Sequence, residues 1–302
     1  MKLADTPSVA LQGIAVVLNA ASGPGHSPAQ VEQSFREAGI DARVFVGRAG
    51  EDVGALTRRA LRERPAILVA GVGDGTLNSV VNALRGTGTA LGVLPLGTLN
   101  HFAKDLGLPL ELEAAVRVIA ADRRADVDLG EVNGRSFLNN ASLGVYPDIV
   151  RERTRQQRRF GRSKLAAMLW ATLGAINRSP LLTMRLELDE HEHECRAPFV
   201  FVGNNDYAME GFNIGTRARL DGGRLSIYTT SHCHRGGLVK LALRALLGRL
   251  RQAEDFVALR TRTLRVETRH KRLLVATDGE VSVMETPLEF RILPRALQVV
   301  VP

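Results

Sequence analysis

Apolar and polar positions along the first 125 residues follow the alternation of strands and helices that is typical of an α/β fold. Short apolar runs, typical of buried parallel strands, fall at residues 13–19, 42–46, 66–70 and 90–94. Segments with helical spacing of apolar residues lie between and after them, at residues 27–38, 52–63, 76–84 and 112–121. Ser27 and Pro28 are suited to begin the first helix. The pattern predicts a doubly wound α/β domain at residues 1–125, with a parallel sheet covered on both faces.

The pattern changes after residue 125. Apolar runs at residues 127–132 and 136–140 flank Asn133-Gly134, a dipeptide that favours a hairpin turn of the primed type. Further strands are expected at residues 183–188, 199–202, 225–229, 256–259, 264–267, 273–276, 288–292 and 297–301, with helical segments near 163–177 and 235–252. We predict an antiparallel β-sandwich over residues 126–302 and leave open the return of its last strand to the first domain.

Composition narrows the class of protein. The 302 residues are 45% hydrophobic and include only two cysteines, Cys195 and Cys233, which cannot form a disulfide framework. The strongly apolar helical stretch at residues 165–176 is shorter than the ~20 residues that span a bilayer. The N-terminal residues contain no apolar core of a secretory signal. The simplest interpretation is a reduced, cytoplasmic protein with a globular fold.

Charge suggests the kind of partner. The chain has 40 Lys and Arg residues against 32 Asp and Glu residues, which gives a net charge of +8 and a pI near 10.1. The surplus suits nucleotide phosphate, nucleic acid or an acidic membrane face. An arginine-rich but merely solvated surface is the alternative. Because the arginines are dispersed and aromatic residues make up 5%, nucleic-acid binding is disfavoured.

A glycine-rich loop follows the third predicted strand. Gly71, Gly73 and Gly75 allow a tight turn and close approach to a ligand, and the next helix directs its N-terminal N–H groups there. Asp74 would repel bare phosphate, so we expect a Mg²⁺ ion or a ribose hydroxyl between them. Thr76 is predicted to cap the helix. Without a ligand, the segment would be a plain glycine-rich connection.

Two more loops leave neighbouring strands, at residues 19–23 and 95–102. Ligands of open α/β sheets bind at the carboxyl ends of the strands, so three polar loops on one rim favour a nucleotide site. No Gly-Lys-Ser/Thr follows the glycines, which excludes a Walker loop. The first strand–helix turn lacks Gly-x-Gly-x-x-Gly, which excludes a dinucleotide fingerprint.

Four segments in order resemble the motifs of the diacylglycerol kinase-like lipid kinases, a family related to sphingosine kinases. Residues 72–76 (VGDGT) are similar to its Gly-Gly-Asp-Gly-Thr motif, and residues 95–104 (PLGTLNHFAK) to its Pro-x-Gly-Thr-x-Asn-Asp-Phe-Ala-Arg motif. Residues 19–23 (NAASG) resemble Asn-Pro-x-Ser-Gly, and residues 278–280 match Asp-Gly-Glu. Taken alone, residues 278–280 would be read as a hairpin turn.

The resemblance implies transfer of a phosphoryl group from ATP, with Mg²⁺, to a lipid hydroxyl, at a site between the two domains. It implies that Glu280 is the general base, that Asp278 is its acidic neighbour, and that Asp74 lies near Mg²⁺–ATP. The nucleotide-binding residues that it implies are Asn19, Ser22, Gly23, Gly47, Gly73, Asp74, Gly75, Thr76, Leu77, Asn78, Ser79, Gly97, Thr98 and Asn100.

The sequence departs from the family pattern in several places. Val72, Ser79 and His101 replace a Gly, a Glu and an Asp, which keeps open a non-catalytic nucleotide- or lipid-binding regulator. An NAD kinase, which shares the Gly-Asp-Gly-Thr loop, is another alternative. Many members hold a structural Mg²⁺ through an Asp in a segment like residues 219–225; Asp221 lies one residue before the expected position, which falls on Gly222.

A membrane contact is also expected. Seven basic residues lie within residues 151–164, and an apolar helical stripe follows at residues 165–176. Such a combination suits peripheral binding to the anionic inner face of a membrane, and residues 235–251 form a second such segment. The alternative is a solvated charged run and a helix packed on the sandwich. No motif indicates the lipid or the oligomeric state.

Overall fold

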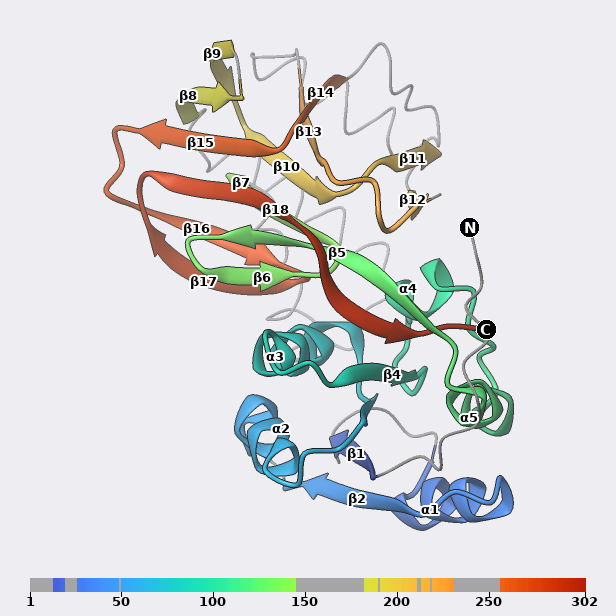
Figure 1. Cartoon of the computed structure of the whole chain (residues 1–302). Helices are drawn as coiled ribbons and strands as arrows, with labels where there is room; N and C mark the ends of the chain where they lie inside the picture. The colour runs from blue at the N-terminus through green and yellow to red at the C-terminus, as the bar shows by residue number, and fades with distance from the viewer. Residues whose placement is uncertain are drawn as a thin grey trace, which may run out of the picture. The chain divides into compact units, whose positions relative to one another are not determined.

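The computed structural model of the protein describes residues 13–19, 26–48, 50–144, 182–189, 191–210, 213–217, 219–230 and 256–302 (Figure 1). The chain divides into two compact units. Unit 1 comprises Met1–Asp126 and Leu297–Pro302, and unit 2 comprises Val127–Ala296. Strand β18 (Leu288–Val300) therefore contributes residues to both.

Unit 1 contains a parallel sheet in the order β2-β1-β3-β4. Its strands are β1 (Ile14–Asn19), β2 (Ala42–Gly47), β3 (Ile67–Gly71) and β4 (Ala90–Leu94). Its helices are α1 (Pro28–Glu37), α2 (Val53–Leu61), α3 (Asp74–Leu84), α4 (His101–Asp105) and α5 (Leu112–Ala121). The end of β18 joins this sheet in parallel, with Val299 opposite Leu91 on β4.

Helices cover both faces of this sheet, as predicted. Helices α1 and α5 lie together on one side and α2 and α3 on the other (Figure 1). Because both faces are covered, every residue of β3 and β4 is buried, which explains their continuous apolar runs. Ser27 caps α1 through a capping box with Gln30, as expected. Asp52 caps α2 by accepting the N–H groups of Gly54 and Ala55.

Unit 2 consists mainly of antiparallel strands, also as predicted. One sheet has the order β18-β15-β8-β9, with β5 and β6 joined to it at β18, and the other has the order β14-β13-β10-β7-β16-β17; β11 and β12 pair separately. The strands of unit 2 other than β18 are β5 (Arg124–Val132, which begins in unit 1), β6 (Arg135–Phe137), β7 (Asn140–Gly144), β8 (Leu182–Leu188), β9 (His191–Ala197), β10 (Phe199–Asn204), β11 (Tyr207–Glu210), β12 (Asn213–Arg217), β13 (Leu225–Thr230), β14 (Phe256–Thr261), β15 (Thr263–Thr268), β16 (Arg272–Thr277) and β17 (Glu280–Glu285).

Alternate residues of the two sheets form one hydrophobic core. Phe137, Leu143 and Val202 contribute from one part of the chain, and Val266 and Phe290 from another. The core joins both sheets, which confirms the sandwich. Asn133 and Gly134, with φ of 45° and 83°, form the predicted hairpin turn between β5 and β6.

Several element boundaries differ from the prediction. Helix α3 begins at Asp74 and Gly73 is its N-cap, so the predicted cap at Thr76 is wrong. The last two predicted strands form one strand, β18, within which Arg295 has a φ of 51°. The predicted strand at 136–140 corresponds to β6 and shares only Asn140 with β7. The pattern missed α4 and strands β7, β9, β11, β12 and β17, which are short or mostly polar. The predicted helices at 163–177 and 235–252 lie outside the described residues.

Candidate functional site

In unit 1, the candidate site begins at the carboxyl ends of parallel strands. Strand β1 lies between β2 and β3, so the chain turns to one side of β1 first and later to the other. The crevice outside such a switch point is where open α/β sheets bind ligands. The strand register sets Asn19 opposite Gly47, and Leu18 opposite Gly71. Three predicted site segments therefore lie at one rim of the sheet.

The loops after β3 and β4 meet through two glycines. A Cβ atom built on Gly97 would lie 2.9 Å from the Cα of Gly73 and 2.8 Å from Oδ1 of Asn100. It would also lie 3.7 Å from the backbone nitrogen of Asp74. Because no side chain fits in such a gap, glycine at position 97 allows the two backbones to meet beside the start of α3.

Asn100 shapes its own loop. Its Oδ1 accepts the N–H of Gly97 at 2.9 Å, and its Nδ2 donates to the carbonyl groups of Pro95 and Gly97 at 3.0 and 2.9 Å. Its φ of 51° lies in the left-handed region that asparagine tolerates better than most residues. In this structure the amide therefore serves to close the loop that carries Gly97 and Thr98, and Thr98 itself is exposed.

The first turn of α3 leaves two backbone N–H groups without a partner inside the helix. The carbonyl of Gly73 accepts the N–H groups of Thr76 and Leu77, which leaves those of Asp74 and Gly75 outside the helix's own bonding pattern. Residues 73–76 are half-buried, whereas Leu77 and Asn78 are buried. Among the predicted binding residues here, 73–76 are thus the ones that can face a ligand.

The remaining predicted residues of unit 1 have different surroundings. Gly47 is buried, and a Cβ built on it would approach Leu56 Cδ2 to 3.2 Å, so it packs closely against α2. Ser79 is half-buried on α3. Val72 is 4% exposed, so its side chain lies in the core of unit 1. His101 is exposed at the start of α4. Ser22 and Gly23 lie outside the described residues.

In unit 2, Asp278 and Gly279 form the two-residue turn between β16 and β17, with φ of 49° and 85°. The Asp278 carboxylate accepts three backbone N–H groups, from Leu138 and Asn139 at 2.7 Å each and from Asn140 at 3.1 Å. Burial raises the pKa of this carboxyl, while those three N–H groups and the charge of Arg217 act in the opposite direction. The turn is therefore a hairpin turn, and its buried carboxylate is the anion that the backbone N–H groups of residues 138–140 bind.

Glu280 begins strand β17, directly after this turn. Its Oε2 accepts from Nη2 of Arg135 at 2.6 Å, and its side chain is 37% exposed. Arg135 lies on β6, three residues before Leu138. The segment 135–140 thus contacts the turn through both Glu280 and Asp278, a pairing that the sequence pattern did not predict.

Buried polar residues from other strands surround that segment. Arg217 is 4% exposed and donates to Leu138 and Asn139, and Asn204 Nδ2 donates to the carbonyl groups of Asp128 and Leu138 at 2.8 Å each. The sequence analysis missed these residues. No local motif marks them, because their partners are distant along the chain.

The structural Mg²⁺ that the family implies does not fit residues 219–225. Asp221 forms an ion pair with Arg219 at 3.0 Å, and the hydrogen bond from Arg219 lowers the pKa of that carboxyl. At Gly222, a Cβ would lie 2.7 Å from Oδ1 of the buried Asn205, so Asn205 occupies the space an Asp side chain would need. No group of three or more His, Cys, Asp or Glu suited to a metal occurs among the described residues. The predicted metal ligand Asp221 is therefore a poor one.

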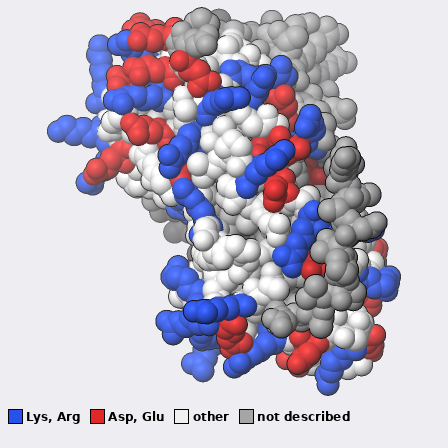
Figure 2. Space-filling model, in the orientation of Figure 1, with Lys and Arg blue, Asp and Glu red and all other residues white. Residues whose placement is uncertain are grey.

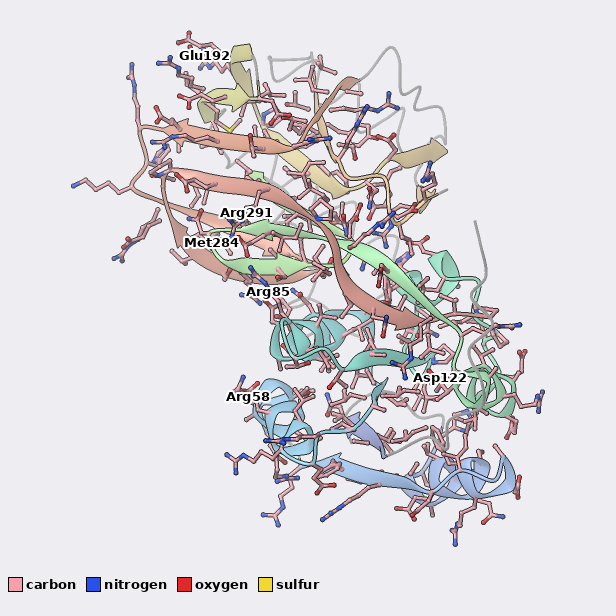
Figure 3. All side chains as sticks on the ribbon, viewed as in Figure 1. Arg58, Arg85, Asp122, Glu192, Met284 and Arg291 are labelled. Atoms are coloured by element: carbon pink, nitrogen blue, oxygen red, sulfur yellow. The ribbon has the colours of Figure 1, made fainter. Side chains whose placement is uncertain are left out.

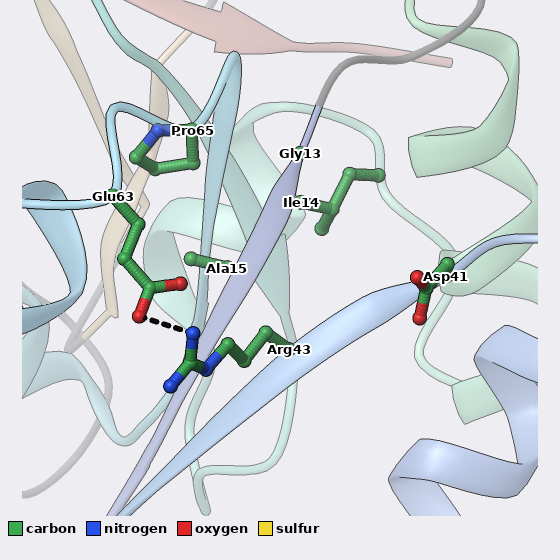
Figure 4. A pocket seen from close by; sticks show the side chains of 7 residues that line it. All are labelled: Gly13, Ile14, Ala15, Asp41, Arg43, Glu63 and Pro65. Carbon is green, nitrogen blue, oxygen red and sulfur yellow. Dashed lines mark ion pairs between the residues drawn. The ribbon is translucent and has the colours of Figure 1, made fainter.

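Two hollows in the described surface contain none of the predicted site residues. One, of about 150 Å³, lies at the amino ends of β1 and β2, beside the Arg43–Glu63 ion pair at 2.7 Å (Figure 4). This is the rim opposite the glycine loops. The other, of about 560 Å³, lies on the outer face of unit 2, between Glu131, Asp189 and Arg265.

Charges of both signs alternate on that outer face (Figure 2). Arg291 projects from β18 and pairs with the buried Glu131 at 2.6 Å, and Glu192 of β9 pairs with Arg185 (Figure 3). Arg265 pairs with Glu289 at 3.2 Å. Positive and negative side chains pair with one another on this part of the surface, so it is not a patch of positive charge.

Comparison with known proteins places these features in a family. A family model of the diacylglycerol kinase catalytic domain matches residues 13–132, and a model of the YegS C-terminal NAD kinase beta sandwich-like domain matches residues 142–301. A Pseudomonas aeruginosa protein named "Probable lipid kinase YegS-like" is 35% identical over 88% of this chain and 87% of its own length. The chain belongs to the diacylglycerol kinase-like lipid kinase family.

Other members of the lipid kinase family agree. A Bacillus subtilis protein named "Diacylglycerol kinase" is 30% identical over 91% of this chain and 90% of its own. The solved structure of a diacylglycerol kinase from Bacillus anthracis has the same fold, with a TM-score of 0.71, 18% identity and coverage of 97% and 98% of the two chains. As a family member the protein is a kinase. Its described part contains no helix with the length and apolar character to cross a bilayer.

Proposed function

We propose that the protein transfers the γ-phosphoryl group of ATP, with Mg²⁺, to a hydroxyl of a diacylglycerol-like or related lipid. The observation that supports this most is the meeting of the two glycine loops at the carboxyl ends of β3 and β4, on the rim of unit 1 that also has the switch point. There, the backbone N–H groups at the start of α3 provide a site for anionic phosphate. Family membership supplies the reaction type.

The residues of unit 1 would bind and orient the nucleotide. Residues 73–76 would receive the phosphates, with Thr98 and Asn19 at the same rim. Asp74, half-buried at the start of α3 with no hydrogen bond to its carboxylate among the described residues, has the oxygen donors that Mg²⁺ prefers. When bound, the metal would neutralise charge on the transferring phosphate.

The residues of unit 2 would handle the proton. The bond between the γ-phosphorus and its bridging oxygen breaks, a bond to the lipid oxygen forms, and the hydroxyl proton passes to Glu280. Arg135, bonded to Oε2, orients that carboxylate. Asp278, buried and bonded to residues 138–140, would hold the turn that carries Glu280 rather than contact the substrate.

The lipid would be reached at a membrane surface. A cytoplasmic protein that meets the anionic inner face at its periphery fits the net charge of +8. The basic run at 151–164 and the apolar segments at 165–176 and 235–251, proposed to make that contact, lie outside the described residues.

Incubation of the purified protein with ATP, Mg²⁺ and a panel of lipids, followed by mass spectrometry, tests the proposal. The panel holds diacylglycerol, monoacylglycerol, phosphatidylglycerol and a sphingoid base. We expect one class to gain a phosphate, and Glu280→Gln to lower that rate by at least about 10²-fold, as loss of a general base does. Glu285→Gln, at the far end of the same strand and paired with Arg272, is the matched control.

NAD is the second acceptor to include, because the matched C-terminal family model is described as NAD kinase beta sandwich-like. If NAD is phosphorylated and no lipid is, the acceptor is NAD and not a lipid. Binding of ATP with no product from any acceptor would instead favour the regulator and contradict an active kinase.

A further inference from the structure

Arg217, the last residue of β12, is buried in unit 2 with 4% of its surface exposed. Burial of a guanidinium is costly unless its N–H groups find acceptors. Here Nη1 donates to the carbonyl of Leu138 at 2.7 Å and of Asn204 at 3.3 Å, and Nη2 donates to Oδ1 of Asn139 at 2.8 Å. The guanidinium also lies 5.5 Å from the ring centre of Tyr207. Its charge is therefore held in one place.

The segment 138–140 that Arg217 contacts is the one that Asp278 contacts. Arg217 bonds to acceptors of Leu138 and Asn139, whereas Asp278 accepts the N–H groups of residues 138–140. Two buried side chains of opposite charge thus bond to the same short stretch of backbone. The positive charge of Arg217 also favours the ionised form of Asp278, by lowering a pKa that burial raises.

Asp278 connects this arrangement to Glu280. The backbone N–H of Asp278 donates to the carbonyl of Asn140 at 2.9 Å, and Glu280 pairs with Thr277 across the two-residue turn. A shift of residues 138–140 would therefore move the turn and, with it, the start of β17. Asn139 is held further by Tyr207, whose hydroxyl donates to its carbonyl at 2.8 Å.

We propose that Arg217 is a positioning residue for phosphoryl transfer, which acts through residues 138–140 and Asp278 on the carboxylate of Glu280. This inference rests on the proposed function, because Glu280 is the group whose position matters. Arg217 itself does not contact substrate in this assignment. Its loss would take the Arg217 donor from Oδ1 of Asn139 and leave the carbonyl of Leu138 with Asn204 Nδ2 alone of these two donors. Asp278 would lose the charge of Arg217.

Steady-state kinetics of three variants test this. Arg217→Met keeps an unbranched side chain in place of the arginine stem but removes the charge and the donors, and Arg217→Lys restores the charge. Arg272→Met is the matched control, since Arg272 lies on β16, the strand that leads to the turn at Asp278, with a side chain 70% exposed and paired with Glu285. We expect Arg217→Met to lower kcat about 10²-fold, the effect of a small misplacement, with KM for ATP within about twofold. Arg217→Lys recovers part of kcat, and Arg272→Met matches the parent protein.

A second measurement does not depend on activity. Amide hydrogen exchange at Leu138, Asn139 and Asn140 should be faster in Arg217→Met than in Arg272→Met, while exchange in β1 and β3 of unit 1 stays unchanged. Exchange and kcat equal in these two variants would overturn the inference and leave the kinase proposal intact. A parent protein that phosphorylates no acceptor would overturn the kinase proposal, and faster exchange at 138–140 would then support only the structural link.

Discussion

The candidate functional regions of unit 1 and of unit 2 are built differently. In unit 1, the loops after β3 and β4 meet backbone to backbone, where a Cβ on Gly97 would come within 2.9 Å of Gly73 Cα. In unit 2, the turn at residues 278–279 is held by its own Asp278 carboxylate, which accepts backbone N–H groups of residues 138–140. Arg135 of β6 bonds to Glu280 beside the turn, and Arg217 of β12 bonds to residues 138 and 139. The region in unit 1 depends on the absence of a Cβ atom from glycine, and the region in unit 2 depends on charged groups that are buried and hydrogen-bonded. Substitutions should therefore damage the two regions in different ways.

Gly97→Ala should have the largest effect. Its methyl group would collide with the Cα of Gly73 and Oδ1 of Asn100, so one loop must move relative to the other. A displacement near 1 Å at a site that positions a reactant costs about 10² in rate. We expect kcat/KM for ATP to fall by about that factor.

Gly75→Ala is the matched control for the unfolding temperature only, not for the kinetics. A Cβ at Gly75 meets nothing within 4 Å, so it makes no close backbone contact, and alanine favours a helix. It should keep or raise the unfolding temperature, whereas Gly97→Ala lowers it. Equal temperatures and equal ATP kinetics for Gly97→Ala and the parent protein would contradict the close approach of the loops.

Asp278→Asn tests the region built from side chains. The amide keeps one acceptor but turns N–H groups toward backbone donors of residues 138–140, and it removes the charge opposite Arg217. Loss of charge-assisted bonds to buried groups costs about 2–3 kcal/mol. We expect that decrease in the free energy of unfolding in urea. Asp206→Asn, exposed and paired with Arg260, should change it by less than about 0.5 kcal/mol; similar values for the two would contradict the buried anion site.

Asp189 offers a pH test of the sandwich. Partial burial raises the pKa of its carboxyl, but N–H groups of Arg262 and Thr263 and nearby hydroxyls outweigh this and lower it to about 2. The bonds therefore stabilise the fold above the ordinary pKa near 4 and are lost as pH falls toward 2. Because the residue is exposed, solvent reduces the effect to about 1 kcal/mol.

The measurement is urea unfolding of Asp189→Asn and the parent protein at pH 7 and at a series of acid pH values that ends below the folded-state pKa of about 2. The difference in unfolding free energy should be about 1 kcal/mol at pH 7, should decrease as pH falls below the ordinary pKa near 4, and should approach zero only below pH 2. A difference that stays constant with pH would mean that the carboxylate is not responsible.

The smallest expected effect is that of Mg²⁺ on the stability of unit 2. Asp221 pairs with Arg219, and Asn205 fills the space beside Gly222. We therefore expect amide exchange at residues 219–224 to have the same rate in Mg²⁺ as in EDTA, both measured without nucleotide. In the double variant Asn205→Gly, Gly222→Asp, which opens that space and supplies a carboxylate, we expect Mg²⁺ to slow exchange there. Slower exchange with Mg²⁺ in the parent protein would show a metal site after all.

Local pattern predicted much of this molecule because it rests on local causes. The apolar runs of β1, β3 and β4 are continuous because both faces of their sheet are covered, and the cap at Ser27 needs only residues three positions apart. The start of α3 at Asp74 was missed because glycine at position 73 serves as a cap without a side-chain bond. Strands such as β9 and β12 were missed because tertiary pairing, not apolar alternation, makes them strands.

By itself, the sequence determined the order of strands and helices, the glycine loops on one rim and the acidic turn at residues 278–280, since spacing along the chain is enough to define each. Only the tertiary structure decided which buried side chains contact one another in unit 2. Arg217 and Asp278 meet at residues 138–140, and Asn205 fills the space beside Gly222. Such partners are far apart along the chain, and only the packing of strands in the sandwich brings their buried polar groups within bonding distance.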